Sequence, residues 1–215
     1  MIIKNQIDML DTMYPSYGEK VVNALYHARP YSTIYGYIIS GDVEFPNSCK
    51  AIEGQYFSAW TANDLAIRTS GEVVIFTRLG YKGQFNIGGP LENSGRLCYI
   101  DGCSDSLLIY PPRQGDPSLN LLHFPENTQQ TFHIHPSIRL GVVIRGEGLA
   151  CIKEDGIDKQ IELKPGNIFC IEEREAHRFM TIKQEMVVLA FHPDGDWGPT
   201  DHDHTMLNRT YLIKR

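Results

Sequence analysis

The sequence predicts an all-β protein. Its apolar residues fall in short runs rich in Val, Ile, Tyr and Phe, and Gly, Pro and Asn punctuate these runs. Nineteen glycines and twelve prolines supply many turns, while 42% hydrophobic and 10% aromatic residues suffice for substantial cores. A third observation is that parts of the pattern occur twice along the chain, which indicates two similar β units.

The first residues carry the best helical pattern. Val21, Val22, Leu25 and Tyr26 have helix-compatible spacing after a break at residues 15–18. One short helix is therefore expected within residues 1–29.

Strands are expected next, and a linker follows them. The runs that predict strands are 35–40, 54–60, 65–69 and 72–79. Residues 80–95 contain five glycines and one proline, and nothing there except a short strand around Phe85 is long enough for a regular element. This places the boundary between a first domain, 1–95, and a second domain, 96–215.

The second domain contains more predicted strands. They are residues 96–100, 106–111, 119–124, 130–135, 140–146, 148–154, 159–164, 167–173, 176–182 and 186–192. Three segments of this domain match earlier ones in order: 139–146 matches 34–41, 166–169 matches 54–57, and 185–191 matches 72–76. Ordered matches of this kind favour a tandem origin.

Three histidines of the second domain form the candidate metal site. His133 and His135 are two residues apart, so on one strand their side chains point to the same face. His177, which follows a turn and begins another predicted strand, can supply the third imidazole. Three neutral imidazoles that leave coordination positions open suit iron(II), manganese, nickel, copper or zinc. A His-x-His pair also occurs by chance, so the surrounding sequence matters.

That surrounding sequence resembles the two motifs of the cupin superfamily. The relevant residues are 131–148, TFHIHPSIRLGVVIRGEG, and 165–179, PGNIFCIEEREAHRF, and the likeness extends over about residues 120–192. The resemblance implies a double-stranded β-helix, the cupin jelly roll, here as a bicupin of two tandem barrels. In the first domain Arg29 and Leu65 stand where His135 and His177 would be, which implies a degenerate barrel kept for packing or dimerisation.

One position departs from the cupin pattern. The pattern has a Glu ligand four or five residues after the second histidine, where this chain has Arg139 and Leu140. Arg stays protonated and offers no lone pair, so it cannot replace the carboxylate. The resemblance then implies a three-histidine site with a cation nearby, which favours an anionic substrate. Arg139 can alternatively be a surface strand residue paired with an acid.

Other histidines are candidates for substrate binding. His192 follows a strand and can reach the pocket, and His123 is either a pocket residue or a structural one. The segment 192–204 holds three histidines, four aspartates and Trp197, and can be a second metal site, a lid or a solvated loop.

Composition limits the class of partner and compartment. The net charge is −6 and basic residues are scattered, so no nucleic-acid surface is expected. No apolar span reaches membrane length, and five cysteines without CxxC spacing indicate reduced thiols in the cytoplasm.

A metal-dependent enzyme is the favoured function. Three-histidine cupins resemble thiol and diketone dioxygenases, which implies a non-haem iron(II) dioxygenase acting on a small anionic molecule. The alternatives are a cupin isomerase or lyase with another divalent metal, a non-catalytic ligand-binding cupin, and a structural bicupin. A homodimer is expected because cupins commonly pair through exposed strands.

Overall fold

The computed structural model of the chain describes residues 1–154, 157–204, 206, 210, 211 and 213. Within these residues strands dominate, and the sole helical element is the 3-10 turn η1 (Ile100–Gly102). The predicted all-β class is confirmed.

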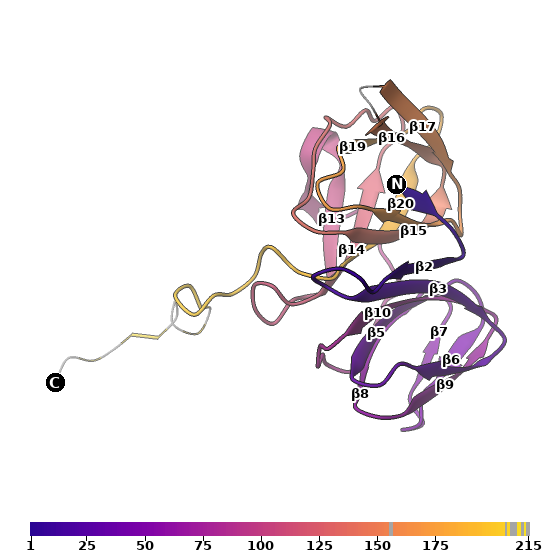
Figure 1. Ribbon diagram of the computed structural model, residues 1–215, viewed down its shortest axis with the longest axis vertical. Helices are drawn as coiled ribbons and strands as arrows, with labels where there is room; N and C mark the ends of the chain where they lie inside the picture. The colour runs from indigo at the N-terminus through magenta and orange to yellow at the C-terminus, as the bar shows by residue number, and fades with distance from the viewer. Residues whose placement is uncertain (155–156, 205, 207–209, 212, 214–215) are drawn as a thin grey trace.

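The strands of the first part of the chain form two sheets, in the lower part of Figure 1. A six-stranded sheet has the order β11-β8-β5-β10-β3-β2, and a four-stranded sheet has the order β4-β9-β6-β7. Their bounds are β2 (Gln6–Met9), β3 (Ser16–Val22), β4 (Leu25–Ala28), β5 (Ser32–Ile38), β6 (Asp42–Glu44), β7 (Lys50–Ile52), β8 (Tyr56–Thr61), β9 (Leu65–Ser70), β10 (Glu72–Leu79) and β11 (Asn86–Gly88).

The later strands form a second pair of sheets above the first (Figure 1). A seven-stranded sheet has the order β1-β18-β15-β20-β14-β13-β12, and a three-stranded sheet has the order β17-β16-β19. Their bounds are β1 (Ile2–Ile3), β12 (Leu97–Cys98), β13 (Ser104–Ile109), β14 (Ser118–Phe124), β15 (Arg139–Gly146), β16 (Gly148–Glu154), β17 (Ile157–Leu163), β18 (Ile168–Ile171), β19 (His177–Met180) and β20 (Met186–His192).

The start of the chain belongs to the second pair of sheets. Strand β1 pairs with β18 in antiparallel register, with Ile2 opposite Cys170. The remaining strands follow the order of the sequence, with β2–β11 in one pair of sheets and β12–β20 in the other. The division of the chain at residue 95 therefore describes the sheets only if β1 is counted with the later part.

The short helix expected within residues 1–29 is wrong. Val22 closes strand β3 and Leu25 opens β4, with Asn23 in the left-handed region at φ 47° between them. Val21 is 7% exposed and its neighbour Val22 is 53% exposed, which is the alternation of a strand. Two short strands around a tight turn have an apolar spacing that resembles that of a helix. The pairing of β3 with β10 stabilises the strand instead of the helix.

The two large sheets share a strand order. The sequence β8-β5-β10-β3 in one corresponds to β18-β15-β20-β14 in the other. The likeness extends to packing: Gly36 of β5 faces the ring of Phe57, and Gly141 of β15 faces the ring of Phe169. At either glycine an added Cβ would lie 2.2–2.4 Å from a ring carbon, so only glycine fits there.

An apolar core joins the two large sheets. It contains Tyr35, Phe76 and Phe191, with Phe76 and Phe191 stacked at a centroid distance of 5.6 Å. Separate clusters fill the interior of each pair of sheets. In the part of the chain that the structure describes, no helix has the length and apolarity to cross a bilayer.

Candidate metal centre

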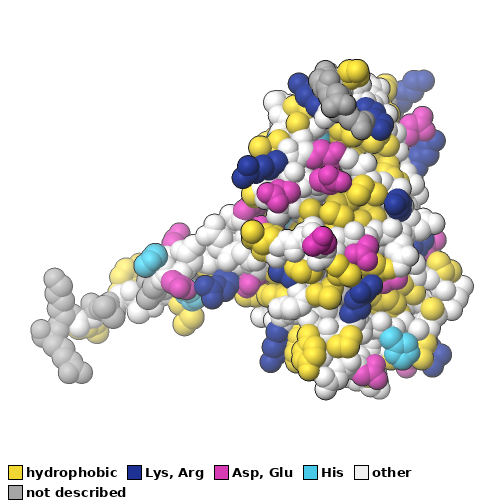
Figure 2. All heavy atoms as spheres, in the orientation of Figure 1, with side chains coloured by type: hydrophobic (Ala, Val, Ile, Leu, Met, Phe, Trp, Pro, Cys, Tyr) yellow, Lys and Arg dark blue, Asp and Glu magenta, His cyan; other side chains and the backbone are white. Residues whose placement is uncertain are grey.

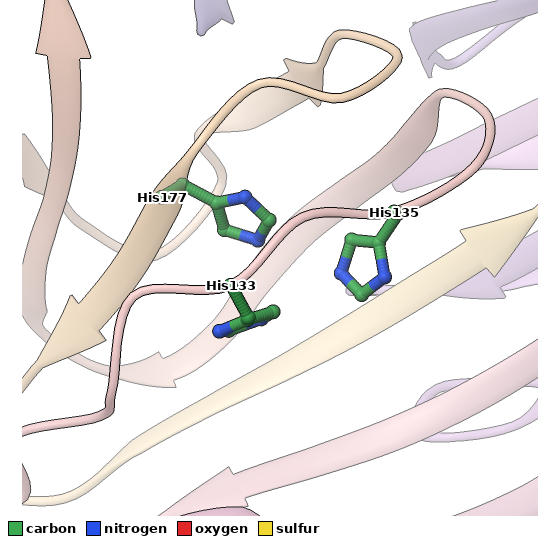
Figure 3. Close-up of side chains that lie close together, drawn as sticks. All are labelled: His133, His135 and His177. Carbon is green, nitrogen blue, oxygen red and sulfur yellow. The ribbon is translucent and has the colours of Figure 1, made fainter.

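The three predicted histidines come together inside the second pair of sheets. One ring nitrogen from each of His133, His135 and His177 lies within 4.8 Å of the others. Figure 3 shows His133 and His135 on one connecting segment, with His177 at the start of β19. Within the described residues this is the one group of three or more side chains arranged to hold a metal ion.

Backbone pairing positions two of these histidines. His133 and His177 form an isolated antiparallel bridge in which each amide donates to the carbonyl of the other, at 3.0 Å. Here the prediction of a regular strand over 130–135 is wrong, because the chain is irregular on both sides of that bridge. His135 therefore reaches the site from a loop, although the spacing of two from His133 still places both rings in the same cavity.

The hydrogen bonds of the rings determine which nitrogens are free. Nδ1 of His133 lies 2.9 Å from the carbonyl of Thr131, and Nδ1 of His177 lies 2.8 Å from the carbonyl of Glu175. A carbonyl only accepts, so each Nδ1 must carry the proton, which leaves the Nε2 lone pair for a ligand. His177 Nε2 is buried and has no hydrogen-bond partner among the described residues.

Two of the three imidazoles are neutral at ordinary pH, those of His135 and His177. Burial, followed by the positive charge of Arg139, lowers the pKa of His135 to about 3. Burial also lowers the pKa of His177 to about 4, although the hydrogen bond to Glu175 opposes this change. Neutral imidazole is the form that binds a metal.

His133 and His135 of the triad line a cavity of about 390 Å³. Most of its wall is apolar, including Leu107, Leu122, Phe124, Phe169, Phe179 and Val188. The polar part of the wall includes Asp105, Asn120, Gln130, Arg139, His192 and Asp196. A small, mainly apolar cavity with a few polar groups is typical of sites for small molecules.

Comparison with known proteins supports a fold assignment. No family model and no curated protein matches the sequence. Among solved structures, a cupin 2 conserved barrel domain protein from Leptotrichia buccalis superimposes with a TM-score of 0.60 at 15% identity, covering 86% of either chain. Two oxalate decarboxylases are also similar. The enzyme from Lactobacillus farciminis, solved with formate, has a TM-score of 0.57 at 9% identity, covering 92% of this chain and 88% of its own. The Bacillus subtilis enzyme, known for its Mn(II) centers, has a TM-score of 0.54 at 11% identity over 92% and 79%.

The chain is a cupin in fold. The likeness covers most of the chain, and it confirms the resemblance that the histidine motifs indicated. Sequence identities this low establish the fold only, so the chemistry has to be argued from the residues of the site.

The residues of the site fit a divalent metal. Three imidazole nitrogens converge, and one of them is a buried atom that would otherwise lack a partner, at a cost of about 1–3 kcal/mol. The position where the cupin pattern has a Glu is indeed occupied by Arg139, which is 3% exposed and lines the cavity. The set therefore suits a metal bound by imidazole alone.

Arg139 is buried and lines the cavity, so the alternative of a surface residue is wrong. The acidic partners of that alternative are nevertheless present, because Nη1 lies 3.1 Å from Asp194 and Nη2 lies 3.7 Å from Asp196. Ser137 donates a short hydrogen bond to Asp194 and accepts one from Arg139. The buried ion pair thus ties the segment after β20 to β15.

The other two candidate histidines lie in different surroundings. His192 lines the cavity, its ring centroid is 6.5 Å from that of His135, and its buried Nδ1 has no partner among the described residues. His123 does not line this cavity: its Nε2 is 3.0 Å from Glu185 and its Nδ1 is 3.4 Å from Ser104. His123 is placed as a structural residue of the sheet.

The segment 192–204 divides into two parts. Asp196 and Trp197 line the cavity, and Trp197 packs edge-on against Tyr110 at 5.2 Å. The later part leaves the body of the protein as an extended tail with acidic and histidine side chains along it (Figure 2). His202 is exposed there, and among the residues that the structure describes no metal-binding group forms in the tail.

Sequence reasoning missed several residues of the site. Asp105, Asn120 and Gln130 were not singled out, since an isolated polar residue in or beside a predicted strand gives no local signal of its orientation. The alternation of side chains along β13 and β14 would have been the one indication.

The cysteines agree with expectation. All five are free, and Cys103, Cys151 and Cys170 are buried.

Proposed function

We propose that this cupin is a metal-dependent enzyme that binds a divalent transition metal through His133, His135 and His177. The observation that carries the proposal is the convergence of three imidazoles, including the buried and unpartnered Nε2 of His177, beside a cavity lined by His133 and His135. A purely structural barrel would have no need to leave that nitrogen without a partner.

Iron(II) is the favoured metal and a dioxygenase the favoured reaction class. The three histidines would hold iron(II) and leave coordination positions free, and the metal would supply the site at which a substrate and dioxygen meet. With no carboxylate ligand, the three histidines leave the full charge of the ion uncompensated, which favours a small anionic substrate. Apolar walls formed by residues such as Phe169 and Phe179 would exclude water and strengthen these interactions.

Two residues of the chain would orient the substrate. Arg139 presents a guanidinium on the wall beside the triad, held rigid by Asp194 and Ser137. His192 presents a neutral imidazole, because burial lowers its pKa well below the ordinary value. We assign them to substrate positioning, and no residue of the chain is assigned to proton transfer.

A lyase with another metal is the second candidate. Oxalate decarboxylases, one of them known for Mn(II) centers, share the fold over 92% of this chain. A small dianion such as oxalate would suit the same cavity, since a metal ion attracts carboxylates. Manganese would then be expected in the site.

Metal analysis tests the proposal first. Protein purified without chelator or His tag is analysed by elemental mass spectrometry, together with oxygen uptake in the presence of small diketones, thiols and keto acids. Near-stoichiometric iron with oxygen uptake supports the dioxygenase, whereas manganese, zinc or nickel without uptake supports the lyase or isomerase.

A matched pair of variants links the metal to the site. His177→Ala is expected to abolish binding, and His27→Ala, which removes a histidine that is 62% exposed on β4, is expected to leave it unchanged. Absence of bound metal even after reconstitution of the wild type would exclude the metalloenzyme and favour a non-catalytic ligand-binding cupin.

A further inference from the structure

A buried carboxylate lies on a cavity wall that the proposed function does not use. Asp105 of β13 is 9% exposed and Asn120 of β14 is 3% exposed, and both line the cavity. The register places Asp105 opposite Leu122, and Asn120 opposite Ala190, all of which face the same interior. These strands belong to the seven-stranded sheet, whereas His177 belongs to the three-stranded one, so the carboxylate and the triad occupy different walls.

Asp105 has only neutral partners. The amide nitrogen of Asn120 donates to both carboxylate oxygens, at 3.2 and 3.1 Å, and the amide oxygen of Asn120 accepts from Ser118 at 3.1 Å. Among the described residues no Lys, Arg or His forms an ion pair with Asp105. Burial accordingly raises the pKa of its carboxyl, while the hydrogen bond from Asn120 lowers it.

The cation of this cavity is already paired. Arg139 is engaged by Asp194 and Asp196, so it is not available to compensate Asp105. Tyr99, Asp105, Arg139 and Asp196 all line this cavity. Burial raises the pKa of the Tyr99 hydroxyl most, the charges of Asp105 and Asp196 raise it further, and the charge of Arg139 lowers it. An ion placed in the triad would add positive charge on the other wall.

We infer that the carboxylate of Asp105 is a recognition site for an ammonium group of the ligand, so that the cavity takes a small zwitterion whose acidic end faces the triad. A buried carboxylate without a cation is costly, and a ligand ammonium would provide both the missing charge and hydrogen-bond donors. Asn120 holds the carboxylate in position for this contact. The placing of the acidic end rests on the proposed metal site, whereas the ammonium site depends on Asp105 alone.

Matched pairs of small acids test the inference. The probes are glycine with acetate, 3-aminopropanoate with propanoate, and 4-aminobutanoate with butanoate, titrated calorimetrically into zinc-loaded and metal-free full-length protein. For at least one chain length the amino acid is expected to bind about tenfold more tightly than its deaminated partner, the size expected of a charge-assisted hydrogen bond. Equal binding, or binding of neither member, at all three lengths would overturn the inference.

Variants assign the preference to Asp105. Asp105→Asn keeps the shape of the side chain and is expected to bring the two affinities of a pair to within about twofold, with little change for the deaminated acid. Glu185→Gln removes a carboxylate that directly precedes β20 and lies outside the cavity, and should preserve the preference. Asp105→Ser is the second variant if the first does not fold, as judged by its melting curve. A preference that survives removal of the carboxylate would contradict the assignment.

The same experiment distinguishes failure of the ammonium site from failure of the metal site. Zinc content is measured on the same samples, so protein that binds no zinc yet shows the ammonium preference would remove the metal site and support the Asp105 site. Protein that binds zinc at the triad without any ammonium preference would support the metal site and overturn the Asp105 site.

Discussion

Acidification of the metal-free protein should destabilise it through the buried histidines of the triad. The perturbation is a change from pH 7 to pH 5 in the presence of a chelator. The pKa of His135 is lowered to about 3 and that of His177 to about 4, from an ordinary value of 6.5. Both groups stay neutral in the folded state at pH 5, whereas both become protonated in the unfolded chain.

The sign and size of the change in the free energy of unfolding follow from proton linkage. Below pH 6.5 the unfolded chain binds more protons than the folded protein, so stability is lost as the pH falls, and the loss stops only near the folded pKa values of about 3 and 4. At pH 5, 1.5 units below the ordinary value, the loss is about 2 kcal/mol for each histidine and about 4 kcal/mol for the pair. His192 acts in the same direction. The carboxyl groups of Glu19 and Asp105 oppose it, because burial raises their pKa values.

Comparison of variants isolates the contribution of each histidine. Urea unfolding is measured at both pH values for the wild type and for His177→Gln, and the variant should lose about 2 kcal/mol less on acidification than the wild type. His27→Gln, at an exposed position, should behave like the wild type. Equal losses of the free energy of unfolding in His177→Gln and the wild type between pH 7 and pH 5 would refute the claim that the buried imidazole of His177 stays neutral in the folded protein.

Two further predictions concern packing and the buried ion pair. Phe191→Ala removes a fully buried ring stacked on Phe76 between the two large sheets, and should lower the free energy of unfolding by about 3–5 kcal/mol, measured in urea. Phe85→Ala, at a side chain that is 47% exposed, should cost clearly less. Arg139→Met leaves the carboxylate of Asp194 buried without a cation and should cost about 3–5 kcal/mol. The double variant Arg139→Met/Asp194→Asn should recover part of that loss, and equal stability of the single and double variants would contradict the pairing.

Local pattern was sufficient for much of the strand content. Runs such as 72–79 and 186–192 are β-rich and bounded by turn residues, and they became β10 and β20. The helix expected around Val21 and Leu25 failed because two short strands joined by a tight turn share their apolar spacing with a helix. Only pairing with another strand distinguishes the two, and that pairing is not local.

The sequence by itself determined the all-β class, the cupin-like motifs and the three histidines, because strand alternation and ligand spacing are local properties of the chain. The tertiary structure alone decided that the backbones of His133 and His177 pair, that Arg139 is neutralised by Asp194, and that Asp105 faces the cavity without a cation. Each of these depends on which strands become neighbours and in what register. A shift of one residue would turn every such side chain to the opposite face, and no local signal sets that register.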